Sequence, residues 1–210
     1  MAQPTNTFDT YDSVGEREDL SDVIYSISPT DTPFLSSAAK TKATAVLHEW
    51  QTDALAAAVT TNAVIEGDEA TLDASTATTR LSNSCQIMDK TVVITGTQES
   101  VDKAGRASEL AYQIAKKAKE LKRDMEANLT GSIAEVTGSA TAARKMGTLG
   151  AWVITNDDKA SDGTTGAGIG NTKRTDGTAR AFTEASLKTV IKSVWNAGGD
   201  PSMIMVGPFN

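Results

Sequence analysis

The 210-residue sequence predicts an α+β protein, because its β-forming and helical stretches follow one another along the chain instead of alternating. Residues 44–50 and 80–97 are rich in β-forming residues and flank a long polar segment. A helical pattern then runs over 100–130, and another starts at Thr183. We therefore expect a β excursion, a long helix and a smaller mixed module, in that order.

An extended arm followed by one short helix is predicted at the start of the sequence. Residues 1–12 show no apolar periodicity, whereas Ser13 and Glu16 have the spacing of a capping box. Four apolar residues then recur at the spacing of one helix face: Leu20, Val23, Ile24 and Ile27. Ser28 precedes a proline, which disfavours helical backbone, so we expect the helix to end there and a turn to follow over 30–33.

Residues 44–97 are predicted to form an extended β loop with a strand at each root. The second strand, 80–97, contains the strongly β-forming run 91–95. The segment between the strands is rich in Ala, Thr, Asp and Glu, and no Lys or Arg occurs from 43 to 79. A two-stranded ribbon is marginal in water by itself, so we expect this loop to lie on another surface.

Residues 100–130 are predicted to form one continuous helix. One stripe carries four apolar residues that we expect to be buried: Leu110, Ile114, Leu121 and Met125. Gly105 is the weakest position of this helix, and Gly131 is expected to end it in a left-handed conformation. Five basic residues lie on its exposed face: Lys116, Lys117, Lys119, Lys122 and Arg123.

The rest of the chain predicts a mixed module. Residues 149–155 are expected to form a buried strand, and 156–180 a long, mobile, glycine-rich surface loop. Thr183 is expected to cap a second helix, which the glycines at 198 and 199 end. The continuous apolar run 203–206 is typical of a strand that is buried on both faces.

The residues that carry chemistry exclude most enzyme classes. Histidine and cysteine occur once each, so no disulfide framework and no site with two imidazoles can form. His48 and Cys85 are therefore interpreted as structural residues, and we expect no catalytic residue, no metal and no cofactor. Gly166 and Gly168 begin a dinucleotide-binding pattern, but its third glycine falls at Asn171, and no P-loop lysine is present.

Composition favours a protein whose surfaces are covered by partners. Hydrophobic residues make up 39% of the chain and aromatic residues only 5%, and small residues are abundant. The net charge is −7, and the acidic excess lies in the first 75 residues. This distribution does not fit a nucleic-acid-binding protein, which needs a basic face. Two other functions stay open on this evidence: a nucleotide-dependent enzyme that uses the loop 163–170, and a β-rich appendage or adhesion protein.

Several short segments resemble one subfamily of capsid proteins of tailed bacteriophages, whose members share the Hong Kong-phage capsid fold. The segments that carry the resemblance are 4–8, 11–15, 17–22, 27–34, 48–53, 198–201 and 206–209. The order of arm, acidic loop, long helix and mixed module is also that of these major capsid proteins. Members of the family normally continue past a Gly-Pro-Phe segment such as 207–209, so we expect the natural chain to extend beyond Asn210.

The resemblance implies a domain for each part of the chain. It places an N-terminal arm over 1–43, an extended loop over 44–97, and a spine helix with a peripheral domain over 98–182. Residues 183–210 would begin the axial domain or complete the peripheral one.

The resemblance also implies a structural protein of the virion capsid, made in the host cytoplasm, and not an enzyme. Such a major capsid protein assembles with copies of itself, as hexamers and pentamers, into an icosahedral head shell that encloses double-stranded DNA. Only weak, non-specific contact with that DNA and no contact with a membrane are expected. Portal, scaffold and decoration proteins are the other partners that the resemblance implies.

In the resembled fold, the extended loop of one subunit reaches across the next. We therefore expect the acidic residues of the loop to face basic groups of a neighbouring copy, including at least two of the five on the long helix. The acidic residues concerned are Glu49, Asp53, Glu66, Asp68, Glu69 and Asp73.

Overall fold

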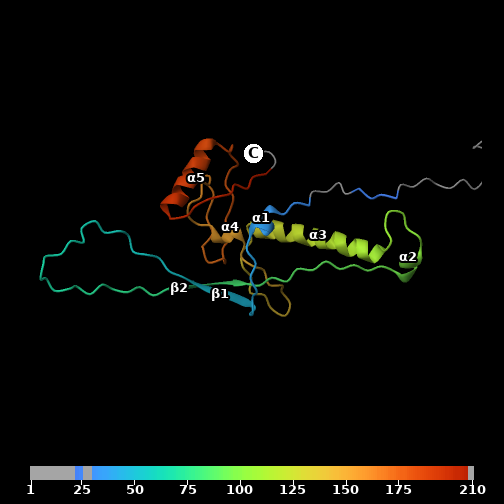
Figure 1. The fold of residues 1–210 in the computed structure, drawn as a ribbon, viewed down its shortest axis with the longest axis horizontal. Coiled ribbons are helices and arrows are strands. Elements are labelled where there is room, and N and C mark those ends of the chain that lie inside the picture. The colour runs from blue at the N-terminus through green and yellow to red at the C-terminus, as the bar shows by residue number, and fades with distance from the viewer. Residues whose placement is uncertain (1–21, 26–29, 208–210) are drawn as a thin grey trace, which may run out of the picture. The chain divides into compact units, whose positions relative to one another are not determined.

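The computed structural model describes residues 22–25 and 30–207. Its mixture of helices and one two-stranded sheet confirms the predicted α+β class (Figure 1). The chain divides into two compact units, one of Met1–Thr30 with Lys90–Glu120 and one of Asp31–Asp89 with Leu121–Asn210.

Most of the predicted arm helix lies outside the described residues. Its described part, 22–25, is bent and extended, so the prediction is wrong for Val23 and Ile24. Their side chains are 55% and 41% exposed. A short helix is marginal in water unless an apolar face packs on a neighbour, and these side chains lack such cover among the described residues.

In the first unit, two helices replace the single helix that was predicted from residue 100. Helix α2 spans Gly96–Ser100, and α3, Glu109–Thr130, begins after a loop. In that loop Gly105 has φ +75°, and its N–H donates to the Asp22 carboxylate. A left-handed residue interrupts helical backbone, so the prediction of one continuous helix is wrong at this end.

The N-terminus of α3 is capped by two side chains. The Ser108 hydroxyl accepts from the N–H of Ala111 at 3.2 Å. The Glu99 carboxylate, from α2, accepts from the N–H groups of Glu109 and Leu110 at 3.0 and 3.2 Å. A hydrogen bond with Ser108, together with these N–H groups and Lys103, holds the pKa of Glu99 below its ordinary value. Glu99 thus accepts hydrogen bonds from N–H groups that have no partner within the helix at its N-terminus.

Acidification is therefore expected to loosen the junction between α2 and α3. A carboxylate with a lowered pKa stabilises the fold above its ordinary pKa of about 4.3, and that contribution is lost as pH falls through the folded-state value. Hydrogen exchange of the Glu109 and Leu110 amides, corrected for intrinsic rates, should quicken over that range. The Glu99→Ala variant should show faster exchange of these two amides at neutral pH, whereas the matched loop variant Glu69→Ala should not. Equal protection of both amides in Glu99→Ala and the parent protein would contradict the role assigned to this carboxylate.

The apolar stripe of α3 is buried only in its second half. Leu121 and Met125 are half-buried, whereas Leu110 and Ile114 are 46% and 54% exposed, so the prediction of burial is wrong for these two. Periodicity shows which face is apolar, but not whether the chain supplies an element that covers it. Gly131 follows the helix without the predicted left-handed conformation, and its N–H donates to the Asn128 carbonyl at 3.2 Å.

The second unit contains the predicted β ribbon. Strands β1, Leu47–Thr52, and β2, Thr79–Ser84, pair antiparallel from Leu47 opposite Ser84 to Thr52 opposite Thr79. The prediction that β2 would continue through 91–95 is wrong. Those residues are extended but have no strand partner in the part of the chain that the structure describes, and Val93 is 93% exposed. β-forming residues make a strand only when a second strand is paired with them.

The predicted turn over 30–33 is not found: residues 30–32 are irregular, and Pro33 begins a short helix, α1, Pro33–Ser37. Its proline occupies the first turn, where no N–H is needed. Both carboxylate oxygens of Glu126, from the second half of α3, accept from its N–H groups: Phe34 at 2.8 Å and Leu35 at 2.7 Å. This contact lies within the second unit, which includes α3 from Leu121 onward.

The predicted strand over 149–155 is a single helical turn, α4, Leu149–Trp152. Val153 and Ile154 are 42% and 41% exposed, so the expected burial is also wrong. The glycine-rich segment after it, which was predicted to be a mobile surface loop, is connected to the rest of its unit by backbone hydrogen bonds. Backbone hydrogen bonds join Thr164 to Thr175, Arg174 to Gly150 and Glu135 to Gly170.

Helix α5, Glu184–Asn196, matches the prediction. Thr183 caps it by accepting from the Ser186 N–H at 3.2 Å. Gly198 follows at φ +84°, and the N–H of Gly199 returns to the Val194 carbonyl at 2.9 Å, as expected for a glycine stop. The run 203–206 is not the predicted strand, since its four side chains are 44–59% exposed without a pairing partner in the described chain. Within the ranges 22–25 and 30–207, every helix is too short or too polar to cross a membrane.

Candidate assembly interface

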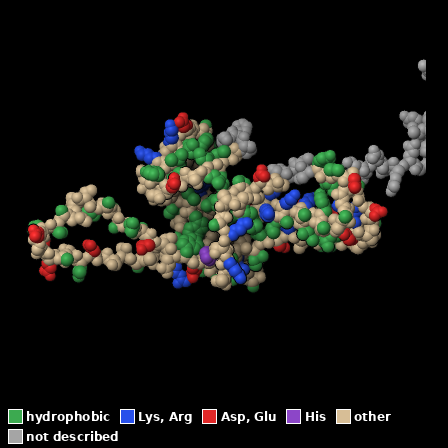
Figure 2. All heavy atoms as spheres, viewed as in Figure 1, with side chains coloured by type: hydrophobic (Ala, Val, Ile, Leu, Met, Phe, Trp, Pro, Cys, Tyr) green, Lys and Arg blue, Asp and Glu red, His purple; other side chains and the backbone are tan. Residues whose placement is uncertain are grey.

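The segment between β1 and β2, residues 53–78, forms a long open excursion that we call the acidic loop (Figure 1). All of its residues are exposed. A tight turn at its centre closes with a hydrogen bond from the Asp68 N–H to the Ile65 carbonyl at 3.1 Å, and Gly67 supplies φ +86°. Figure 2 shows acidic and apolar side chains along the loop, without a basic one among them.

Five of the six predicted acidic residues lie on this loop: Asp53, Glu66, Asp68, Glu69 and Asp73. Asp53 and Asp68 each accept a hydrogen bond from the N–H of the next residue at 2.9 Å. These local bonds leave the second carboxylate oxygen directed to solvent or to a partner. The loop therefore presents a set of accessible carboxylates.

The sixth predicted residue, Glu49, is placed differently. It lies on β1 and forms a bidentate ion pair with Arg80 of β2 in the same chain. The pair connects the two strands of the ribbon diagonally, and the hydrogen bond that Arg80 donates to Glu49 raises the pKa of Arg80. Glu49 thus pairs the two strands at the root of the loop within its own chain.

The five predicted basic residues lie on α3, where Lys116, Lys119 and Arg123 share one face at spacings of three and four. Lys117 pairs with Glu120 at 2.7 Å, and that hydrogen bond holds the pKa of Glu120 below its ordinary value. Lys116, Lys119, Lys122 and Arg123 are exposed, and the ion pairs found among described residues include none of the four. The face offers cations for an external partner.

The acidic loop also carries large apolar side chains that the sequence analysis did not single out. They are Leu55, Val59, Val64, Ile65 and Leu72, exposed by 66–99%. Ile65 is the first residue of the turn and Val64 precedes it, so the tip of the loop combines an apolar pair with three carboxylates. An apolar pair next to a Glu-Gly turn in a polar segment is the sequence signal that could have identified this tip.

The glycines of the segment 163–170 serve close packing and not phosphate binding. A Cβ on Gly166 would lie 2.6 Å from the Thr172 carbonyl oxygen and 2.7 Å from that of Ala151. Gly170 has φ +79°, and a Cβ there would lie 2.9 Å from the Trp152 ring. Their backbones face their own chain, which leaves no cradle for a nucleotide.

The remaining candidates for chemistry are structural in the described chain. The Cys85 thiol donates to the Ala45 carbonyl at 3.5 Å, and the His48 ring lies 5.9 Å from that of Trp50. Over the residues that the structure describes, no three His, Cys, Asp or Glu side chains gather as a metal site would require.

Comparison with known proteins identifies the kind of protein that has these features. A model of the family described as SU10 major capsid protein matches residues 3–210. The chain belongs to this family. The major capsid protein of Escherichia phage Phieco32 is 32% identical over 240 aligned residues, which cover 99% of this chain and 68% of that protein. This capsid protein is thus a structural subunit of a phage shell, not an enzyme, and it assembles with copies of itself in the virion.

Proposed function

We propose that this major capsid protein adopts the Hong Kong-phage capsid fold and forms the hexamers and pentamers of an icosahedral head that encloses double-stranded DNA. The arm would cover 1–43, the extended loop 44–97, the spine helix and peripheral domain 98–182, and the start of the axial domain or the end of the peripheral one 183–210. Portal, scaffold and decoration proteins are proposed as further partners, and contact with the DNA as weak and non-specific.

One observation supports the proposal most strongly: the described chain leaves most of its large apolar side chains uncovered. Ala151 is the one fully buried hydrophobic residue in the part described, whereas side chains such as Leu55, Val93 and Leu72 are more than 90% exposed. A soluble monomer rarely shows so much apolar surface, because contact with water costs free energy. Neighbouring copies in a shell would cover it.

We further propose that the acidic loop of one copy faces the basic face of α3 in the next. The loop holds five accessible carboxylates, and α3 holds four exposed cations without an ion pair in the described chain. An exposed ion pair stabilises by only about 0–1 kcal/mol, so the charges would set orientation more than strength.

Charge reversal tests this arrangement. Lys119→Glu with Lys122→Glu should slow assembly of purified subunits roughly five- to thirtyfold, the effect of one or two kcal/mol per contact. Adding Glu66→Lys and Asp68→Lys should restore part of the rate, because the signs then match again. Light scattering follows the rate, and electron microscopy identifies the product. Salt at 1 M should reduce the difference, because it shortens the screening length to about 3 Å.

The matched control reverses two lysines of α5, Lys188→Glu with Lys192→Glu, which changes the net charge equally. It should slow assembly less than the α3 pair and should not be rescued by the loop reversal. If both reversals act equally, or if the loop reversal restores nothing, the charges of the two sets do not face one another.

Neither alternative function has a supporting observation. The backbone of 163–170 packs on its own chain and offers no phosphate cradle. The described residues form one two-stranded sheet, which is too little for a β-rich appendage.

A further inference from the structure

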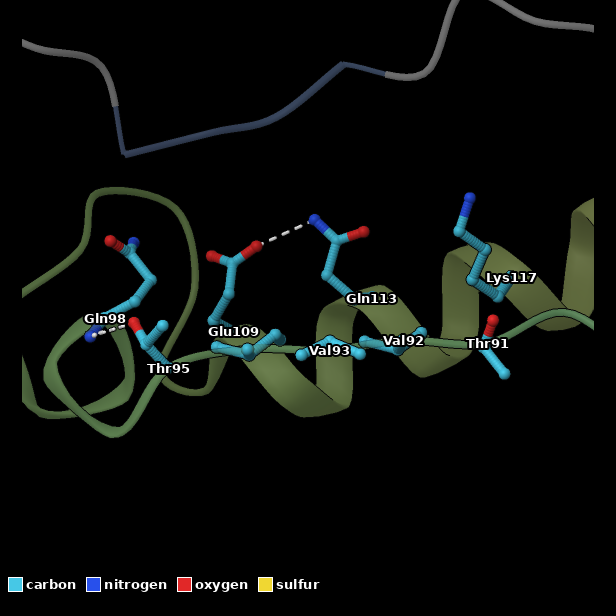
Figure 3. A pocket seen from close by; sticks show the side chains of 9 residues that line it. Thr91, Val92, Val93, Thr95, Gln98, Glu109, Gln113 and Lys117 are labelled. Carbon is cyan, nitrogen blue, oxygen red and sulfur yellow. Dashed lines mark hydrogen bonds between the residues drawn. The ribbon is translucent and has the colours of Figure 1, made fainter.

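The run 91–95 is extended and has no strand partner among the described residues. Its side chains alternate, with Val92 and Ile94 half-buried and Thr91, Val93 and Thr95 exposed, as in a strand with one covered face. Figure 3 shows it beside the first half of α3, with Thr91 near Lys117 and Thr95 near the start of the helix, so it runs antiparallel to α3. The two line a groove of about 530 Å³.

The main chain of this run is free to pair. Among the described residues, no backbone hydrogen bond joins 91–94 to another segment. A flat, β-forming edge of this kind is a template for strand addition, and proteins normally cover it. Val93 points away from the covered face, and 93% of its surface is exposed.

We propose that the acidic loop of a second copy adds its limb 59–65 to this edge as a β-strand. The inference rests on the proposed contact between copies and specifies how it forms. The limb is rich in β-branched residues, is fully exposed, and has no pairing partner of its own in the described chain. Main-chain hydrogen bonds would supply the affinity, and Val64 would gain apolar cover on the face that Val92 and Ile94 share.

Charge complementarity gives the direction of the added strand. Glu66, Asp68 and Glu69 follow the limb directly, and the exposed cations Lys116 and Lys119 lie on α3 next to Lys117, which Figure 3 shows at the Thr91 end of the run. The acidic turn therefore lies at the Thr91 end, which makes the limb antiparallel to 91–95. With Ile65 opposite Thr91, Ala63 stands opposite Val93. Residues opposite in antiparallel strands have Cα atoms about 4.5–5.5 Å apart, within the range that a disulfide spans.

Cysteine pairing between copies tests the inference. In a Cys85→Ser background, subunits with Ala63→Cys are mixed with subunits with Val93→Cys, assembled, and treated with a thiol oxidant. A disulfide-linked dimer of one copy of each is expected on a denaturing gel. Subunits with Ala77→Cys, on the other limb, replace the first variant as the matched control and should give little dimer. An equal yield from the two mixtures would overturn the register.

A second variant tests the main-chain pairing without cysteine. Val93→Pro removes one N–H from an exposed, extended residue, so the subunit should fold normally by circular dichroism. Its assembly rate should fall on the order of tenfold, as expected for the loss of one or two main-chain hydrogen bonds at each contact. Val93→Thr, which keeps the N–H and the branched side chain, should assemble like the parent. Unchanged assembly of Val93→Pro would overturn strand addition.

The outcomes separate this inference from the function on which it rests. If charge reversal on α3 is rescued by the loop but no Ala63–Val93 disulfide forms, the contact between copies stands and strand addition is overturned. Unassembled subunits that carry both cysteines test whether the loop binds its own chain. If they form the disulfide within one chain, the strand added to 91–95 is the chain's own loop, and the proposal that a second copy supplies it is overturned. If neither the rescue nor the disulfide occurs, both proposals fail.

Discussion

Replacing Trp152 with alanine is expected to lower the free energy of unfolding of the unassembled subunit by about 3 kcal/mol, near the lower end of the range for such truncations because the residue is half-buried. The Trp152 ring lies 5.1 Å from that of Trp50, between α4 and the β ribbon, and its Nε1–H donates to the Gly147 carbonyl at 3.1 Å. Truncation removes the contact that joins these segments and leaves a void that few neighbours can fill. Urea denaturation followed by far-ultraviolet circular dichroism measures the loss.

Two variants separate the causes of that loss. Trp152→Phe keeps an aromatic ring against Trp50 but loses the hydrogen bond, so about 1 kcal/mol is expected. Trp195→Ala removes a tryptophan that is 68% exposed and should change stability by less than about 1 kcal/mol in the unassembled subunit. If Trp152→Ala costs no more than Trp195→Ala, the ring pair does not hold the second unit together.

Replacing Gly170 with alanine is expected to destabilise the subunit by about 3 kcal/mol or more. Two costs add at this position. The residue has φ +79°, which costs an L-residue about 1–2 kcal/mol, and its Cβ would lie 2.9 Å from the Trp152 ring, which would have to shift. The same displacement would disturb the hydrogen bond from the Glu135 N–H to the Gly170 carbonyl at 2.7 Å.

Gly198→Ala is the matched control. Gly198 has φ +84°, but nothing lies within 4 Å of the position that its Cβ would take, so only the conformational cost applies. About 1–2 kcal/mol is expected there. Chemical denaturation of both variants measures the difference, which isolates the steric clash. Equal costs would show that Trp152 moves aside freely and that the glycine is needed only for its backbone conformation.

The acidic loop and the basic face of α3 could both be predicted from the distribution of charge along the chain. No Lys or Arg interrupts 43–79, and the five basic residues follow one another on a strong helical pattern. The sequence could not distinguish Glu49 from the acidic residues of the loop, because its ion pair with Arg80 depends on the register of β1 and β2. The strand-like run 91–95 was identified by composition, but that its edge is free is a fact of the tertiary structure.

Signals that act within a few residues were sufficient for some elements. Thr183 caps α5, and Gly198 ends it, through bonds that span three to five residues, so the sequence alone determined that helix. Only the tertiary structure decided whether the β-forming runs form strands; these runs are 91–95, 149–155 and 203–206. A strand needs a partner from elsewhere in the chain or from another chain, whereas a helix closes its own hydrogen bonds. The same reason explains the glycine-rich segment, whose order comes from close contacts with Ala151 and Trp152.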